Sequence, residues 1–521
     1  MNRQAVISIT EGQTGNPACR MARPISLSLY DGEQIAVIGD NAAGKTRLVE
    51  ALTGVNPVQG TALQYDFTPS PLKLVGENIK YIAFRDTYDG ADSNYYHQKR
   101  WNRQDIDDDT PTAGELLDRA FEAAENGSGR LLDAPARARI HEERLALRDR
   151  LYRLFGLDSL LDKFIITLSS GELRKFQLTR TLLALPRVLV LDNPFIGLDA
   201  STRDSLSELL GALTRSMRLM IILVMSRVDV LPPFITHVIP VKGLDVLPKI
   251  PVCDLCDLPS SCDPERGEGA SSAELLSLIS GLPVKDLSSE PFYPVPSDPA
   301  PEIVRCTGVT IRYGDRTILK DFDWTVREGE RWALTGANGS GKSTLLSLVC
   351  ADNPQSYACD ISLFGHKRGT GESIWEIKRH IGYVSPEMHR AYLKNIPSLD
   401  IVASGLFDTV GLFMHPTESQ LDTCRTWMRI FGIEDLADRP YLRLSSGEQR
   451  LCLLARAFVK DPELLILDEP MHGLDLNHCA RVKAIIDVFM ERPRKTLVMV
   501  SHYESELPSC IERRLILERH C

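Results

Sequence analysis

The chain has 521 residues, of which 43% are hydrophobic and 25% charged, and this globular composition excludes intrinsic disorder and fibrous architectures. At roughly 150 residues per domain, the length predicts about three structural units. The formal net charge of −10 argues against a protein that holds nucleic acid by its phosphates, because such binding depends on basic residues.

The apolar stretches of the chain are short. The longest, such as Leu219–Met225 and Leu464–Leu467, have the length of strands and fall far below the roughly 18 residues of a membrane span. Met1–Thr10 alternates in polarity and lacks the pattern of a signal peptide. The cysteines suggest no disulfide framework, so we expect reduced thiols. These features predict a cytoplasmic protein, with any membrane association peripheral and on the cytoplasmic face.

Alternating strands and helices are predicted along the chain. In the first half, Gln34–Ile38 is a short apolar strand that runs into a glycine-rich turn, and Glu172–Leu185 carries apolar residues at helical spacing. Arg331–Thr335 and Glu448–Val459 repeat these two elements in the second half. The pattern predicts an α/β fold.

The segment Leu247–Pro301 lies between the halves and is rich in Pro, Ser and Asp, apart from a short helical island near Ser272–Ile279. We expect a compact linker here. The predicted organisation is therefore a first domain over residues 1–246, a linker over residues 247–300 and a second domain over residues 301–521.

Several motifs occur once in each half, which indicates an internal duplication. A glycine-rich loop is followed by Leu-Ser-Ser-Gly-Glu, then by four apolar residues with an aspartate, then by Gly-Leu-Asp. In the first half these motifs lie at Gly39–Thr46, Leu168–Glu172, Val188–Asp192 and Gly197–Asp199, and in the second at Gly336–Ser343, Leu444–Glu448, Leu464–Asp468 and Gly473–Asp475. The first copy is longer between its loop and its aspartate, and we expect the extra residues in Asp86–Arg150.

Each glycine-rich loop has the pattern that binds the phosphates of a nucleotide. Glycines let backbone N–H groups point inward, the following helix supplies its N-terminus, a lysine reaches the β- and γ-phosphates, and a hydroxyl reaches Mg²⁺. A chance glycine turn is the alternative, but the match occurs twice in the same context. The expected phosphate-binding residues are Gly39, Asp40, Asn41, Ala42, Ala43, Gly44, Lys45 and Thr46 in the first copy and Gly336, Ala337, Asn338, Gly339, Ser340, Gly341, Lys342, Ser343 and Thr344 in the second.

An acidic residue ends the apolar strand in each copy. We expect Asp192 and Asp468 to hold Mg²⁺ through its waters, together with the hydroxyls of Thr46 and Ser343. Glu469, the next residue in the second copy, is placed to activate a water molecule against the γ-phosphate. The alternative is a buried strand whose terminal carboxylates are only solvated.

These motifs, together with the pair Ser501-His502, resemble those of the ATP-binding cassette (ABC) ATPases. The resemblance covers both halves of the chain and leaves out the linker. It implies two tandem P-loop NTPase domains, each with a RecA-like core, a helical subdomain and an antiparallel β part, and an Mg²⁺-dependent ATPase activity. Two fused cassettes without a membrane domain are most similar to the ModF type, a duplicated cassette protein associated by name with molybdate transport.

The resemblance further implies that the two cassettes pair head to tail around two ATP molecules. Each ATP would lie on one phosphate loop and be covered by the Leu-Ser-Ser-Gly-Glu sequence of the other cassette, whose hydroxyls and helix start suit a γ-phosphate. It also implies that Tyr313 stacks on adenine and that Glu469 and His502 are the catalytic base and the γ-phosphate sensor. The covering residues would be Ser169, Ser170, Gly171 and Glu172 from the first cassette and Ser445, Ser446, Gly447 and Glu448 from the second.

The two expected sites are not equivalent. Asn193 stands where the second copy has Glu469, and Arg227 stands where it has His502. Because an amide cannot accept a proton from water, we expect the second site to hydrolyse ATP and the first mainly to bind it. The alternative is that Asn193 still orients water and supports slow turnover.

Two further features leave alternatives open. The family places a glutamine after the strand that follows the phosphate loop, where it contacts Mg²⁺ and relays to a membrane partner, but here Pro386 takes that place and the first copy is also altered. In the linker, Cys253, Cys256 and Cys262 either form part of a zinc site or are ordinary thiols.

The leading function is an energising ATPase that docks on a separate transmembrane permease, for molybdate or a related oxyanion. A second class is a ribosome- or nucleic-acid-associated factor, which the negative charge and the proline-rich linker disfavour. A third class is an ATP-dependent regulator without transport, which the altered relay favours. Association of the native protein with membranes, with ribosomes or with neither discriminates among the three.

Overall fold

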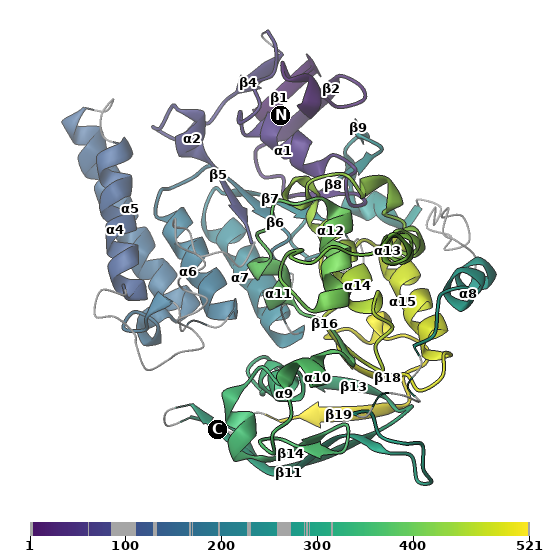
Figure 1. Cartoon of the computed structure of the whole chain (residues 1–521). Helices are drawn as coiled ribbons and strands as arrows, with labels where there is room; N and C mark the ends of the chain where they lie inside the picture. The colour runs from purple at the N-terminus through teal and green to yellow at the C-terminus, as the bar shows by residue number, and fades with distance from the viewer. Residues whose placement is uncertain are drawn as a thin grey trace. The chain divides into compact units, whose positions relative to one another are not determined.

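The computed structural model describes residues 4–60, 62–84, 111–128, 133–165, 168, 170–195, 198, 200–226, 231–257, 272–285, 287, 290, 292–313 and 316–518. The chain divides into two compact units, Met1–Ser261 and Cys262–Cys521 (Figure 1). Each unit has its own sheets and its own hydrophobic cores.

The first unit contains a mostly parallel sheet and a smaller antiparallel one. Its strands are β1 (Ala5–Gly12), β2 (Ile25–Tyr30), β3 (Ile35–Ile38), β4 (Leu63–Tyr65), β5 (Ile79–Ala83), β6 (Val188–Asp192), β7 (Met220–Met225), β8 (His237–Lys242), β9 (Asp245–Val246) and β10 (Ile250–Pro251). The larger sheet has the order β10-β8-β3-β7-β6-β5, in which β8 to β5 run parallel and β9 and β10 pair antiparallel with β8. The smaller sheet has the order β2-β1-β4.

The second unit repeats this plan. Its strands are β11 (Glu302–Tyr313), β12 (Arg316–Arg327), β13 (Arg331–Gly336), β14 (Asp360–Leu363), β15 (His366–Lys367), β16 (Ile381–Val384), β17 (Leu464–Asp468), β18 (Thr496–Val500) and β19 (Arg513–Leu517). The parallel sheet has the order β16-β17-β18-β13-β19, and the antiparallel sheet has the order β12-β11-β14-β15.

The order of the parallel strands is the same in both units. Read from one edge, β5-β6-β7-β3-β8 matches β16-β17-β18-β13-β19 strand for strand. The glycine-rich loops follow β3 and β13, and the aspartates end β6 and β17. Because the carboxyl ends of parallel strands meet at one edge of a sheet, each loop and its aspartate lie at the same edge. The predicted duplication and α/β class are confirmed.

Helices cover the parallel sheets of both units. In the first unit they are α1 (Lys45–Leu52), α2 (Val75–Asn78), α4 (Ala113–Ser128), α5 (Ala134–Phe155), α6 (Ser170–Leu182) and α7 (Ala200–Ser216). In the second they are α8 (Ser272–Ser280), α9 (Lys342–Val349), α10 (Ile374–Lys378), α11 (Pro386–Ala391), α12 (Ser398–Ala403), α13 (Glu418–Phe431), α14 (Ser446–Phe458) and α15 (Leu476–Met490). The predicted helices after Leu-Ser-Ser are confirmed as α6 and α14.

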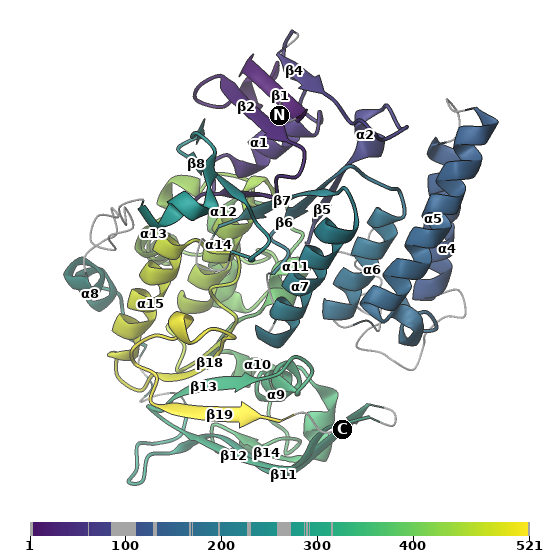
Figure 2. The same ribbon diagram turned by 180° about the vertical axis from the view of Figure 1, so that it is seen from behind.

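The faces of the central strand β17 divide the core of the second unit into two layers. Leu465 and Leu467 pack with the helical cluster of α12 to α15, and Leu464 and Ile466 pack on the other side with α9 and the antiparallel sheet. All four side chains are fully buried. The helical part of the first unit is built from α4, α5 and α6, which stand together in both views (Figure 1, Figure 2). The long helices α4 and α5 lie where the extra residues of the first copy are expected.

Segments of the predicted linker belong to both units. Strand β10 pairs with β8 of the first unit, whereas α8 packs against α13 and α15 of the second. The helical island predicted near Ser272–Ile279 is confirmed as α8.

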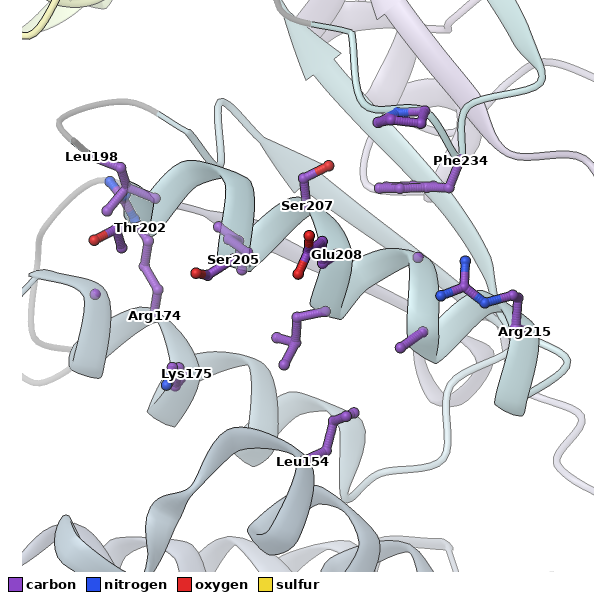
Figure 3. A pocket seen from close by; sticks show the side chains of 16 residues that line it. Leu154, Arg174, Lys175, Leu198, Thr202, Ser205, Ser207, Glu208, Arg215 and Phe234 are labelled. Carbon is purple, nitrogen blue, oxygen red and sulfur yellow. The ribbon is translucent and has the colours of Figure 1, made fainter. Parts of the chain in front are cut away.

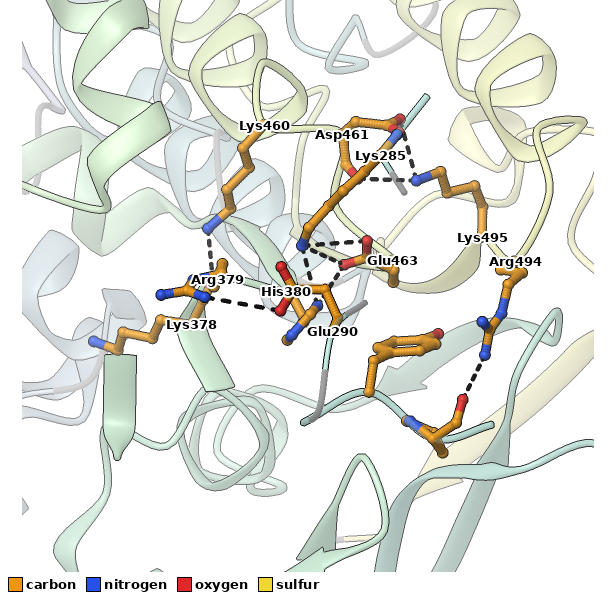
Figure 4. Close-up of polar contacts among 12 residues, drawn as sticks. Lys285, Glu290, Lys378, Arg379, His380, Lys460, Asp461, Glu463, Arg494 and Lys495 are labelled. Carbon is orange, nitrogen blue, oxygen red and sulfur yellow. Dashed lines mark hydrogen bonds and ion pairs between the residues drawn. The ribbon is translucent and has the colours of Figure 1, made fainter. Parts of the chain in front are cut away.

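Beyond α8 the linker is tied to the second unit by buried charges (Figure 4). The Lys285 Nζ lies 3.4 Å from the Glu463 carboxylate and 3.2 Å from His380 Nδ1, and that imidazole nitrogen lies 2.9 Å from Glu463 Oε2. Burial would raise the pKa of Glu463, but the contacts with His380 and Lys285 hold that pKa below its usual range. Asp461 accepts from the Lys285 backbone N–H at 3.2 Å and pairs with Lys495 at 3.1 Å.

Replacing the central carboxylate should destabilise the second unit. Glu463→Gln keeps the shape but leaves the partly buried Lys285 without its counter-charge at a buried carboxylate position, which should cost about 2–4 kcal/mol. Tryptophan fluorescence during urea unfolding reports mainly this unit, because Trp101 is the only one of the five tryptophans outside it.

The matched control is Glu434→Gln, which breaks the exposed pair with Arg429 and should leave the transition near that of the wild type. A folded carboxyl with a depressed pKa contributes stability at neutral pH that is lost as the pH falls. The difference between the Glu463 variant and the wild type should therefore shrink in acid. Equal stability of both variants at neutral pH would contradict this role of Glu463.

Candidate active site

The two glycine-rich loops have the same geometry. Lys45 Nζ donates to the carbonyls of Gly39 at 2.6 Å and Asp40 at 2.7 Å. Lys342 Nζ donates to the corresponding carbonyls of Gly336 at 2.7 Å and Ala337 at 3.0 Å. Each lysine is the first residue of its helix, so the ammonium curls back over the loop at the N-terminal end of α1 or α9. This end of a helix favours an anion.

Glycine is required at both ends of the loop. The residue before each lysine, Gly44 or Gly341, adopts a left-handed conformation with φ of +105° or +99°. A Cβ at Gly39 would lie 2.1 Å from the Val241 carbonyl oxygen of β8, and one at Gly336 would lie 2.4 Å from the Leu517 carbonyl oxygen of β19. The loop therefore keeps close contact with the last strand of its sheet. The hydroxyl residues Thr46 and Ser343 are exposed at the helix starts, where a metal-bound phosphate could be reached.

A buried arginine fixes the end of β17 in the second unit. Arg450 of α14 is 1% exposed, and its guanidinium donates to the backbone carbonyls of Asp468, Glu469, Pro470 and Ser385 at 2.9, 2.5, 3.3 and 3.0 Å. This arrangement ties the helix after Leu-Ser-Ser-Gly-Glu to the residues expected to carry the chemistry. Glu469 itself has φ +48°, a conformation that side-chain-bearing residues rarely adopt.

The carboxylate of Glu469 is held between two histidines. His472 Nδ1 lies 3.1 Å from Oε2, and His502 Nε2 lies 3.1 Å from Oε1. Burial alone would raise the pKa of Glu469, but the contacts with His472 and His502 outweigh burial and hold that pKa well below its usual range. The side chain is therefore ionised at neutral pH, with both oxygens engaged.

The neighbouring Asp468 has the opposite character. It is 4% exposed, and burial together with the nearby carboxylates of Glu387 and Glu469 raises the pKa of Asp468 well above its usual range. Such a crowd of carboxylates is relieved by a cation, so these residues fit Mg²⁺. In the described residues no group of three or more His, Cys, Asp or Glu is arranged to hold a metal alone. Mg²⁺ is commonly bound by one or two carboxylates, waters and substrate phosphates.

The first unit has the same backbone frame with different side chains. Asn193 has φ +49°, and its N–H donates to the Val224 carbonyl at 2.9 Å, as the Glu469 N–H donates to Val500 at 3.0 Å. Its side-chain Nδ2 donates to Asp192 Oδ1 at 2.8 Å. The other oxygen of Asp192 accepts from the Tyr81 hydroxyl at 2.8 Å. The amide of Asn193 thus stands in place of the Glu469 carboxylate, whereas both units carry a tyrosine at the position of Tyr81, since Tyr383 pairs with Ile466 as Tyr81 pairs with Val190.

The Leu-Ser-Ser-Gly-Glu sequences begin the helices α6 and α14. Ser445 and Glu448 form a reciprocal cap, in which the Ser445 hydroxyl accepts from the Glu448 N–H at 3.3 Å and the Glu448 carboxylate accepts from the Ser445 N–H at 2.7 Å. In the first unit Glu172 pairs with Lys163 at 2.8 Å. Ser446, Gly447, Ser170 and Gly171 follow within the first turns.

Some predicted residues are placed only in part or not at all. Tyr313 ends β11, and its hydroxyl accepts from Nδ2 of Asn353 at 3.0 Å; Asn353 follows α9. Ser169, Arg227 and Cys262 lie outside the described residues. The cysteine question is therefore untested, and Cys253 is exposed.

Sequence reasoning missed four residues around the carboxylates: Arg450, His472, Glu387 and Tyr81. His472 could have been found from its place three residues after Glu469, and Glu387 from its place next to Pro386. Pro386 opens α11, with the Ser385 hydroxyl accepting from the Met388 N–H at 3.1 Å, so a short helix begins where the relay glutamine is expected. The contacts of Tyr81 depend on strand pairing and those of Arg450 on helix packing, and no local pattern shows either.

The model of the ABC transporter family matches residues 22–196 and 319–472. The chain belongs to this family. It is 34% identical to the ABC transporter ATP-binding protein ModF of Escherichia coli, over 94% of this chain and 92% of that protein. It is 30% identical to an uncharacterized ABC transporter ATP-binding protein of Schizosaccharomyces pombe, over 94% of this chain and 93% of that protein.

The protein is thus a twin-cassette ABC ATPase that binds and hydrolyses ATP. A solved structure titled "Model of ribosome-bound archaeal Pelota and ABCE1" has a similar fold, with a TM-score of 0.54, 16% identity, and coverage of 94% of this chain and 74% of that chain. At this identity the likeness shows the fold alone. Among the described residues, none of the helices has the length and apolar character needed to cross a membrane.

The two histidines around Glu469 predict a pH effect. Because the His472 contact lowers the pKa of Glu469, His472→Ala should raise it, and the carboxyl will then be protonated at a higher pH. The acid limb of the pH profile of kcat/KM for ATP should move toward neutral pH. His472→Asn, which keeps a donor near the position of Nδ1, should restore part of the wild-type profile.

A uniform loss of activity at all pH values, with the acid limb in place, would instead show that His472 only supports the fold. His415→Ala changes an exposed histidine outside this cluster and controls for loss of an imidazole as such.

Proposed function

We propose that the second cassette hydrolyses ATP while the first cassette binds ATP and retains it. One observation carries this proposal: Glu469 and Asn193 occupy the same backbone position, with φ of +48° and +49°, but only the glutamate can take a proton from water. The amide of Asn193 is moreover turned to Asp192, to which it donates at 2.8 Å.

In the second cassette each residue has a defined task. Lys342 leaves the carbonyls of its loop for the phosphates, and the start of α9 supplies backbone N–H groups to them. Bound Mg²⁺, held by Asp468 and Ser343, would neutralise charge that develops on the phosphates. The low pKa of Glu469 keeps the carboxylate ionised but makes it a weak base. Glu469 would therefore orient the attacking water and accept its proton only late in the reaction, as the water attacks the γ-phosphate. His502, which lies beside the same carboxylate, would contact the γ-phosphate as its sensor.

We also propose that the cassettes pair head to tail, so that the Leu-Ser-Ser-Gly-Glu sequence of each completes the nucleotide site of the other. The start of α14 supports this role, because its serine and glutamate cap each other and leave the next N–H groups oriented along the helix axis. In this arrangement Gly171 serves the site of Lys342, and Gly447 serves the site of Lys45.

The proposed cellular role is to energise a separate membrane permease for molybdate or a related oxyanion. The similarity to ModF over nearly the whole chain supports it. Because Pro386 stands in place of the relay glutamine, the contact with a permease would differ from the one usual in the family. We assign the relay to Glu387, whose negative charge raises the pKa of Asp468. The sequence disfavours ribosome association, but a solved structure of similar fold is titled as ribosome-bound, so that role is tested beside transport.

Removing the base should separate hydrolysis from binding. Glu469→Gln should lower the rate of phosphate release by about 10²–10⁴-fold while ATP binding persists, because the phosphate loop is unchanged. Asn193→Ala should change the steady-state rate little. Equal losses in the two variants would show that both sites turn over, contrary to the proposal.

The crossed pairing makes a prediction that a self-contained site does not share. Gly171→Asp should place a carboxylate against the γ-phosphate held by Lys342 and suppress hydrolysis. Gly447→Asp should instead weaken ATP retention at the first cassette with a smaller effect on hydrolysis. If Gly447→Asp stops hydrolysis and Gly171→Asp spares it, each sequence serves its own cassette. Circular dichroism and the unfolding midpoint check that both variants are folded.

Fractionation of native extract tests the transport role. At native expression level, the protein should sediment with membranes, and Glu469→Gln should be enriched there because it keeps ATP bound. A detergent wash should release it. Sedimentation with ribosomes in a sucrose gradient, abolished by ribonuclease, would favour the alternative role, and presence in neither fraction would favour a regulator.

A further inference from the structure

An open groove crosses the helical side of the first cassette (Figure 3). It has a volume of about 850 Å³, within the range of about 300–1,000 Å³ typical of ligand sites. Its floor and walls come from α5, α6 and α7 and from Phe234. The apolar part is formed by Leu154, Leu206, Leu209 and Phe234.

In the second cassette the corresponding place is filled by the linker helix α8, which packs between α13 and α15. These helices correspond to α5 and α7, because α5 and α13 both end at a Phe-Gly pair and α7 and α15 both follow Gly-Leu-Asp. Leu275 and Ile279 of α8 are each 1% exposed, and Leu282 just beyond is 8% exposed. Their spacing of four and three residues is that of a helix lying in a groove.

Equivalent positions show what α8 covers. Leu154 of α5 is 37% exposed, whereas its counterpart Ile430 of α13 is fully buried. Leu209 of α7 is half-buried, whereas its counterpart Ile485 of α15 is fully buried. The side chains of the first cassette are thus as apolar as those under α8, but no described residue of that cassette covers them in the same way.

The charges at the two places differ. In the second cassette Arg492 holds the end of α8 by donating to the carbonyls of Ile279 at 3.3 Å, Leu282 at 3.4 Å and Pro283 at 2.9 Å. Its counterpart in the first cassette is Ser216, so a helix seated there is held differently. Lys175 and Arg215 line the open groove, and Glu208 is the one acidic residue among the described side chains that line it. This excess of positive charge favours an acidic ligand.

We propose that this groove binds an amphipathic helix of a partner protein, with apolar residues at the spacing of Leu275, Ile279 and Leu282 and with acidic residues beside them. The occupant is not α8 of the same chain, because that helix is already buried in the second cassette. Gly171 and Leu198, next to the nucleotide motifs of the first cassette, also line the groove. A helix bound here is therefore in contact with the elements that respond to ATP.

The test uses a fluorescein-labelled synthetic peptide with the sequence of residues 272–284, which has the stated pattern and carries Glu274. Fluorescence anisotropy with the full chain should show saturable binding. Ser205→Trp places a large ring in the groove from an exposed position of α7 and should weaken binding at least about tenfold, a change of about 1.4 kcal/mol. Asp204→Trp changes the adjacent exposed residue, which does not line the groove, and should leave binding unchanged.

Leu154→Asp on α5 provides a second, independent variant and should weaken binding in the same way. No saturable binding up to about 1 mM peptide would overturn the proposal. Equal binding to the wild type and to Ser205→Trp would also overturn it, because the peptide would then bind elsewhere. A dimer of the wild type that Ser205→Trp abolishes would show a second copy, not a partner protein, in the groove.

Discussion

The chemistry of the second cassette depends on a single buried guanidinium. Arg450 donates to four backbone carbonyls that belong to the end of β17, to the residues after it and to the turn before α11. These bonds fix Glu469 in a left-handed conformation and aim its carboxylate at the edge of the sheet where the phosphate loop lies. Arg450 lies within two turns of Ser445, the N-cap of α14, so a shift of the start of this helix would also move Arg450 and, through its hydrogen bonds, Glu469. Arg174 occupies the same place in the first cassette and is also buried, at 2% exposure.

Much of this arrangement could be predicted from the sequence. Local patterns mark the two phosphate loops, the apolar strands and the helix after Leu-Ser-Ser, and their order predicts the α/β class. The residues after the two aspartates, Asn193 and Glu469, predict that the two sites differ. The surroundings of these residues could not be predicted, because they depend on strands and helices distant in the chain. Tyr81 meets Asp192 across paired strands, and Glu387 acts on Asp468 from a short helix that replaces the expected glutamine. The anchoring of the linker by Lys285 and Glu463 was likewise invisible to composition.

The duplication shows how one frame acquires two tasks. The strand order and the loop geometry are the same in both cassettes, while side chains differ at equivalent positions such as Glu469 and Asn193. At the nucleotide edge the amide of Asn193 stands where the second cassette has the carboxylate of Glu469, and an amide does not accept a proton from water. On the helical side the second cassette has buried its apolar surface under α8, whereas the first has left it open. We therefore propose that the second cassette hydrolyses ATP and that the first binds a partner protein.

The most direct test of this division is to count the nucleotide that remains after rapid desalting of protein incubated with Mg-ATP. The account predicts about one nucleotide per chain, recovered as ATP, which is lost in Lys45→Ala and kept in Lys342→Ala. Recovery of ADP instead of ATP would contradict the account, as would complete loss from the wild type or retention that depends on Lys342 and not on Lys45.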